Sequence, residues 1–157
     1  MRIGLLAVGR LKSGAILTLF DDYVRRLKWP LCVTEVEERR RLPQPALKDR
    51  EGELLLAGLV VANRNCPNPI VVALDERGTT FTSMGFAARI GSWRDQGLDP
   101  VFVVGGAEGL AAPVLERARL TLSLGAMTWP HLLVRVLLAE QLFRAQSILD
   151  GHPYHRA

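Results

Sequence analysis

The sequence has few cysteines, few aromatic residues and no long apolar run, and each shortage excludes a class of protein. The only cysteines are Cys32 and Cys66, and neither Cys-x-x-Cys nor His-Glu-x-x-His occurs, which excludes a disulfide scaffold and the common zinc spacings. No apolar run approaches the ~20 residues that span a bilayer, and the opening run that ends at Gly9 is too short for a signal peptide. We therefore expect a cytoplasmic protein with reduced thiols, no metal and no membrane partner.

Size and composition indicate one ordinary globular domain. The chain has 157 residues, of which 48% are apolar and 6% aromatic, enough to bury a core in a single domain covering residues 1–157. The formal net charge of +4 is a mild basic excess. It suits a polyanionic partner such as nucleic acid, but a net charge of this size does not by itself identify the partner.

Apolar runs alternate with amphipathic segments along the whole chain. Strands are expected at the unbroken apolar runs 3–8, 31–36, 70–74, 101–104 and 120–124. Helical spacing predicts helices at 15–27, 46–61, 83–94 and 132–149, with a short helix near Pro113, a loop at 42–45 and a turn at 75–80. Strands that alternate with helices predict an α/β fold whose mostly parallel sheet is flanked by helices.

Two of the predicted strands end in glycine-containing loops. Gly105-Gly106-x-x-Gly109 follows one of them, and the run Gly125 to Pro130 follows another. Glycine lets backbone approach a ligand closely, and ligands of open α/β sheets bind beyond the carboxyl ends of the strands. The loops lack the full dinucleotide fingerprint and the Gly-Lys-Ser/Thr of a phosphate-binding loop. They therefore predict a pocket lined mainly by main chain, without naming its ligand.

Longer motifs identify a family. Val104-Gly-Gly-Ala-Glu-Gly-Leu110, Met127-Thr-Trp-Pro-His-Leu-Leu-Val-Arg-Val136 and the tail His152-Pro-Tyr-His-Arg156 resemble the ribosomal large-subunit RNA methyltransferase H family over essentially the whole chain. That family belongs to the SPOUT methyltransferases, which are homodimers with a C-terminal trefoil knot. The resemblance implies methyl transfer from S-adenosylmethionine to N3 of a pseudouridine in 23S ribosomal RNA, on assembled ribosomes.

Matching the family motifs residue by residue implies a cofactor site. The residues concerned follow three strands: Leu74, Gly105, Gly106, Gly125, Ala126, Met127, Thr128, Trp129 and Pro130. Trp129 departs from the smaller apolar residue that the family often has at its position, so the loop is expected to fit the cofactor differently there. Its indole has an equally good explanation as a core side chain.

The same resemblance implies that His131, Tyr154, His155 and Arg156 face the target base. Arg156 would stabilise negative charge on the base or a phosphate, and Tyr154 would stack on the base or hydrogen-bond to it. Either His155 or His131 could accept the proton from N3, because histidine titrates near neutrality. His131 could equally be a core histidine that holds the preceding loop.

The run Arg39-Arg40-Arg41 has two interpretations. It could contact phosphates, as an RNA substrate would require, or it could be an ordinary solvated charged surface. Two other functions also remain open at this stage: an RNA- or ribosome-binding module without turnover, and an enzyme that uses NAD or a flavin. The missing first-strand fingerprint argues against the nucleotide-cofactor enzyme, and the His-Tyr-His-Arg tail argues against the pure binder.

Overall fold

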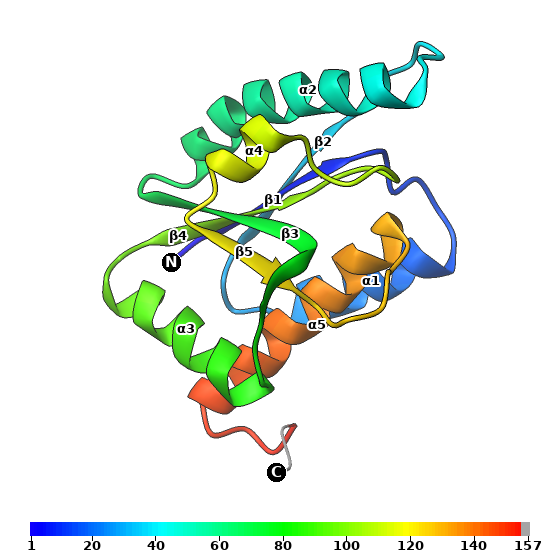
Figure 1. The fold of residues 1–157 in the computed structure, drawn as a ribbon. Helices are drawn as coiled ribbons and strands as arrows, with labels where there is room; N and C mark the ends of the chain where they lie inside the picture. The colour runs from blue at the N-terminus through cyan, green and yellow to red at the C-terminus, as the bar shows by residue number, and fades with distance from the viewer. Residues whose placement is uncertain (155–157) are drawn as a thin grey trace.

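A five-stranded parallel sheet forms the centre of the protein (Figure 1). The computed structural model describes residues 1–154. The strand order is β2-β1-β4-β3-β5, and every pairing is parallel. The strands are β1 (Ile3–Val8), β2 (Leu31–Val36), β3 (Pro69–Thr80), β4 (Asp99–Val104) and β5 (Leu120–Ser123). The prediction of an α/β fold with a parallel sheet and flanking helices is confirmed.

Helices cover both faces of this sheet (Figure 1). One face carries α2 (Gln44–Asn65) and α4 (Ala112–Glu116), and the other carries α1 (Ala15–Arg26), α3 (Ser83–Asp95) and α5 (His131–Leu149). Alternate residues of the central strands serve the two layers: Leu5 and Phe102 pack toward α5, whereas Leu6 and Val103 pack toward α2. Because both faces are covered, every residue of β1 and β4 is buried, which explains their unbroken apolar sequences.

The third strand is longer than its sequence predicts. The turn expected at residues 75–80 is wrong, because β3 continues to Thr80. Pairing with β5 stops after Leu74 and resumes at Thr79, so the intervening residues form a bulge. Gly78 makes the bulge possible, since a Cβ there would lie 2.7 Å from the carbonyl carbon of Thr121.

The second helix also extends beyond its predicted bounds. It begins at Gln44 rather than Ala46 and continues to Asn65, so the loop predicted at residues 42–45 is wrong in its second half. Pro45 lies in the first turn, where helical N–H groups have no partner inside the helix and proline's fixed φ suits the geometry. Helix α3 is capped by Thr82, whose Oγ1 accepts a hydrogen bond from the Gly85 N–H at 3.1 Å.

A buried arginine joins α5 to the carboxyl ends of two strands. The Arg135 side chain is only 1% exposed. Its Nη2 donates to the carbonyl oxygens of Val8 at 2.6 Å and Gly9 at 2.8 Å, and its Nη1 donates to Glu35 Oε1 at 2.6 Å. The guanidinium therefore bridges the end of β1, the end of β2 and the first third of α5.

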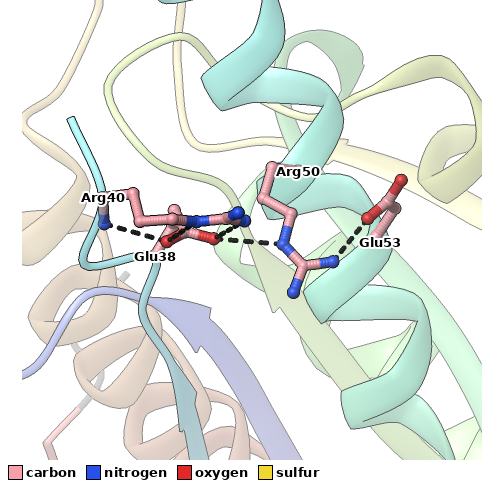
Figure 2. A network of polar contacts seen from close by, with 4 residues as sticks. All are labelled: Glu38, Arg40, Arg50 and Glu53. Atoms are coloured by element: carbon pink, nitrogen blue, oxygen red, sulfur yellow. Dashed lines mark hydrogen bonds and ion pairs between the residues drawn. The ribbon is translucent and has the colours of Figure 1, made fainter. Parts of the chain in front are cut away.

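A surface network attaches the loop after β2 to α2 (Figure 2). The Glu38 carboxylate accepts hydrogen bonds from Arg40 and from Arg50 Nε, all at 2.9–3.0 Å, and Arg50 Nη1 donates to Glu53 at 2.5 Å. These hydrogen bonds, those from Arg40 foremost, hold the pKa of Glu38 well below its usual range. Through Arg50, which is bonded to both Glu38 and Glu53, the outward-facing side of α2 is attached to the loop after β2.

Two features concern the thiols and the helices of the described part of the chain. Within residues 1–154, no helix is long and apolar enough to cross a bilayer. Both cysteines are free thiols, and Cys66 is buried. Burial raises the pKa of the Cys66 thiol to about 11, so it stays protonated at neutral pH.

Replacing Arg135 by methionine is expected to lower the free energy of unfolding by about 3–5 kcal/mol, because Glu35 and two strand-end carbonyls lose a buried partner. Urea denaturation followed by circular dichroism measures this loss. The matched control is Arg25→Met, which removes a 73% exposed side chain and its ion pair with Asp22, for an expected loss of about 0–1 kcal/mol. Equal losses in the two variants would contradict the anchoring role of Arg135.

Candidate active site

A cleft of about 460 Å³ opens beside the β3 bulge, where β4 and β5 end and α5 begins. That volume lies within the range of ~300–1,000 Å³ that is usual for small-molecule sites. Three loops form its walls: the β3 bulge, the loop of residues 105–109 and the loop of residues 124–130. The cleft therefore lies beyond the carboxyl ends of the strands, where the sequence predicts a ligand.

Most residues predicted to bind the cofactor line this one cleft. They are Leu74, Gly105, Gly106, Gly125, Met127, Thr128 and Trp129. Ala126 and Pro130 belong to the same loop but do not line the cleft wall. The sequence analysis missed five charged residues of the wall: Lys48, Asp75, Glu76, Arg77 and Glu108, the last of which lies inside the glycine loop. Three of them follow Leu74 in the segment wrongly expected to be a turn, and Lys48 carries no sequence signal.

The glycine loop after β4 is a closed turn. The Gly109 N–H donates to the Gly106 carbonyl at 3.1 Å, and Gly109 has a φ of 74°, a conformation that favours glycine. A Cβ on Gly105 would lie 2.7 Å from the carbonyl carbon of Gly109. The glycines therefore let the loop fold tightly and turn its main chain toward the cleft.

The opposite wall, residues 124–130, is tied down at two points. Ser123 Oγ donates to the Gly125 carbonyl at 2.9 Å and accepts from the Gly125 N–H at 3.2 Å. Further along, Thr128 Oγ1 donates to Glu76 at 2.8 Å. Met127, which lies between these two hydrogen-bonded points, is 69% exposed, and Trp129, which follows them, is 37% exposed. The mouth of the cleft thus presents two large apolar side chains to a ligand or to another chain.

The β3 bulge contributes fixed charges. Arg77 Nε and Nη2 donate to the Asp75 carboxylate at 3.0 and 3.1 Å. Hydrogen bonding to Arg77 lowers the pKa of Asp75 below its usual value, so this carboxylate is ionised at neutral pH. Asp75 and Arg77 therefore form an ordered, ionised wall beside Leu74.

His131 lies at the start of α5 and lines the cleft. Burial, and then the positive charge of Arg135, lower the pKa of the His131 imidazole below its usual value. Its Nε2 faces Gly9, where a Cβ would lie 3.5 Å away. The imidazole is consequently neutral at pH 7 and able to accept a proton.

Tyr154 lies away from the cleft. Its ring packs edge-on against Phe143 at 4.7 Å between centroids, and its hydroxyl donates to Glu140 at 3.2 Å. Burial foremost raises the pKa of the Tyr154 hydroxyl, so it stays protonated. At ~1.5 Å of rise per residue, Phe143 lies about 18 Å beyond His131 along α5. The other two predicted tail residues, His155 and Arg156, lie outside the described residues.

The arginine run after β2 is partly engaged within the fold. Arg40 is bound to Glu38, and Arg39 Nε lies 3.9 Å from Glu37. Arg10, which follows β1, lies 3.7 Å from the same Glu37 carboxylate. All three arginines of the run are exposed, but Arg40 is hydrogen-bonded to Glu38 and Arg39 has a longer ion pair with Glu37. Searched over residues 1–154, histidine, cysteine and acidic side chains form no cluster suited to a metal ion.

Comparison with known proteins gives a consistent result. A family model described as "Predicted SPOUT methyltransferase" matches residues 1–155. The ribosomal RNA large subunit methyltransferase H of Rhodospirillum centenum is 54% identical over 158 residues, covering all of both chains.

Solved structures share the fold at much lower identity. A "probable methylase family protein" from Haemophilus influenzae superposes with a TM-score of 0.60 at 14% identity, over 99% of this chain and 70% of that one. The SpoU methyltransferase AviRb of Streptomyces viridochromogenes, solved with AdoMet, gives a TM-score of 0.52 at 14% identity, over 92% and 58% of the two chains.

The lowered pKa of His131 predicts a pH-dependent stability. The folded state binds a proton at His131 less readily than the unfolded chain, so this contribution to stability is complete above the unfolded value of ~6.5 and is lost as the pH falls below it. Proton NMR of the imidazole should give a lower midpoint in the folded protein than in urea. Urea denaturation should show a shallower acid-side decline for His131→Gln. A midpoint at or above the unfolded value would refute the assignment.

Proposed function

The chain belongs to the SPOUT methyltransferase family, within its ribosomal RNA large subunit methyltransferase H group, and we propose that it methylates N3 of a pseudouridine in 23S ribosomal RNA with S-adenosylmethionine as donor. The target is the assembled ribosome in the cytoplasm, and one domain of residues 1–157 performs the reaction. The observation that supports this most directly is the main-chain-lined cleft at the strand ends, built from the residues that match the family motifs.

The cleft fits the methyl donor in size and in chemistry. Gly105 and Gly106 offer backbone without side chains on one wall, while Leu74, Met127 and Trp129 offer apolar surface for an adenine ring. Asp75 and Glu76 supply carboxylates suited to hydroxyl and ammonium groups. The bound donor supplies an activated methyl group on a positively charged sulfur. The protein's task is then to align the base and to remove one proton.

We propose that His131 accepts the proton that leaves N3 of the base. An imide nitrogen is a poor nucleophile while it carries its proton, so a base beside the methyl donor accelerates the reaction. The imidazole of His131 lines the cleft and is held neutral by burial and by Arg135. His155 is the alternative acceptor, and the pH dependence of the two single variants would separate them.

The position of Tyr154 supports a homodimer with shared active sites. In its own subunit this tyrosine packs against Phe143, far along α5 from His131. We propose that the tail of one subunit reaches the cleft of the partner, where Tyr154, His155 and Arg156 contact the target base and its phosphates. The exposed Met127 and Trp129 at the cleft mouth would then pack against the second subunit.

The proposal includes a C-terminal trefoil knot. The loop of residues 124–130 returns from the edge strand β5 past the β3 bulge, to which Thr128 is bonded, and then enters α5. Helix α5 packs between α1 and α3 (Figure 1). A C-terminal segment threaded through the β3–β4 region is compatible with that course. It would bring the loops of residues 105–109 and 124–130 close together.

Calorimetry with S-adenosylhomocysteine tests the donor site. The wild-type protein should bind this product, and Arg156→Ala should bind it equally well while losing methylation of ribosomes, because Arg156 is assigned to the RNA side. A folded wild-type protein that binds no S-adenosylhomocysteine at millimolar concentration would overturn the methyltransferase proposal. Full turnover by Arg156→Ala would overturn the role of the tail.

Subunit mixing tests the shared site. His131→Ala and Arg156→Ala homodimers should each be inactive, because both active sites of the first lack His131 and both active sites of the second lack Arg156. After mixing and exchange, heterodimers carry one intact site, so up to about a quarter of wild-type activity should return for random pairing. Mass mapping of the methylated RNA measures it. No recovery despite exchange, as monitored by native mass spectrometry, would place the tail and the cleft of one subunit in the same site.

A further inference from the structure

Glu51 of α2 is a buried carboxylate with no role in the activity described so far. It is 9% exposed, and its Oε2 has no hydrogen-bond partner among the described residues. Its two carboxylate oxygens lie 2.6 and 2.9 Å from the point where a Cβ on Gly106 would stand. The carboxylate thus packs directly against Gly106, a residue of the cleft wall, without lining the cleft itself.

The helix holds this side chain in place. Gly52, the next residue, brings α2 so close to the segment after the loop that a Cβ would lie 2.7 Å from that of Ala111. On the outer face, Arg50 and Glu53 are fixed in the network of Figure 2. Because successive helical residues point about 100° apart, Glu51 must point inward. Its carboxylate has little freedom to move off Gly106.

An unpaired buried carboxylate lowers the stability of the fold. Burial foremost, and then the negative charge of Glu108 in the loop, raise the pKa of Glu51. Lys48 lies one turn earlier on α2, and the adjacent Gly52 packs against Ala111, just before α4, and against Val114 within it. The buried cluster on this face of the sheet is apolar and includes Leu6 and Val103. A leucine would fill the same space without this penalty. The carboxylate therefore requires a reason other than packing.

We propose that Glu51 is a positioning residue of the methyl-donor site, whose carboxylate supports the loop of residues 105–109 and accepts a hydrogen bond from a loop N–H when the donor occupies the cleft. This inference rests on the proposed function of the cleft. The loop is bonded internally from the Gly109 N–H to the Gly106 carbonyl and has the buried carboxylate directly behind it. A small shift of main chain toward Glu51 would satisfy the free Oε2 and fix the wall against the donor.

The first experiment compares Glu51→Gln with wild type and with Glu53→Gln, an exposed neighbour on the same helix that contacts Arg50 rather than the loop. Glu51→Gln should unfold at an equal or higher urea concentration at neutral pH, because a buried charge is removed. It should nevertheless bind S-adenosylhomocysteine about tenfold or more weakly, as expected for loss of a hydrogen bond to a charged acceptor.

The pH dependence separates positioning from packing. Wild-type affinity should rise as the pH rises through the raised pKa of Glu51, since only the ionised carboxylate is a strong acceptor. Calorimetry at a series of pH values above 4.5, the ordinary value for a glutamate, should show this component in wild type and Glu53→Gln and not in Glu51→Gln. Asp75, Glu108 and His131 remain in all three proteins, so the difference reports on Glu51 alone.

A second pair of variants tests the contact itself. Gly106→Ala should lower the urea midpoint, because its Cβ meets the carboxylate, and the loss should be clearly smaller when Glu51 is also replaced by alanine. Additive losses would overturn the contact. Unchanged affinity and an unchanged pH profile in Glu51→Gln, with normal wild-type binding, would overturn the positioning role alone. Failure of wild type to bind would overturn the proposed function and this inference together.

Discussion

The Arg135 guanidinium sets the geometry on which the cleft depends. It is bonded to the last carbonyl of β1, the next carbonyl and a carboxylate of β2, so the start of α5 cannot drift from the strand ends. His131 lies one turn earlier on the same helix, so the contacts of Arg135 also hold His131 at the cleft. Burial foremost, and then the positive charge of Arg135, lower the pKa of the imidazole. Arg135 thus helps to fix where the candidate base lies and adds to the effect of burial on its protonation state.

The remaining walls of the cleft follow from sheet order. Strands β4, β3 and β5 are adjacent, so the loops that leave their carboxyl ends converge although up to about fifty residues separate them in sequence. Glycine at residues 105 and 106 then lets main chain, rather than side chains, face the ligand. The chemistry assigned to this site needs alignment more than covalent assistance, and main chain held by a sheet supplies alignment well.

The sequence predicts the fold class, the strand starts and most of the cleft because those depend on local pattern. Unbroken apolar runs mark β1 and β4, which the structure buries on both faces. The course of β3 beyond Leu74 depends on pairing with β5, and no local pattern reveals that the charged residues 75–78 lie between two paired stretches. Arg135 and Glu51 were missed for a similar reason, since their burial is decided by elements distant in sequence. The assignments of Tyr154, His155 and Arg156 came from family motifs and stay predictions.

The broken register of β3 has a consequence for motion. The strand pairs with β5 on both sides of residues 75–78, and a Cβ on Gly78 would lie 2.7 Å from the backbone of Thr121. Because the Thr128 hydroxyl donates to Glu76 in this segment, residues 124–130 are tied to the same paired strand. Of the three walls, all within the described residues, the loop of residues 105–109 is the one without such a tie to the β3–β5 pair, so it is the wall with freedom to adjust to a small molecule.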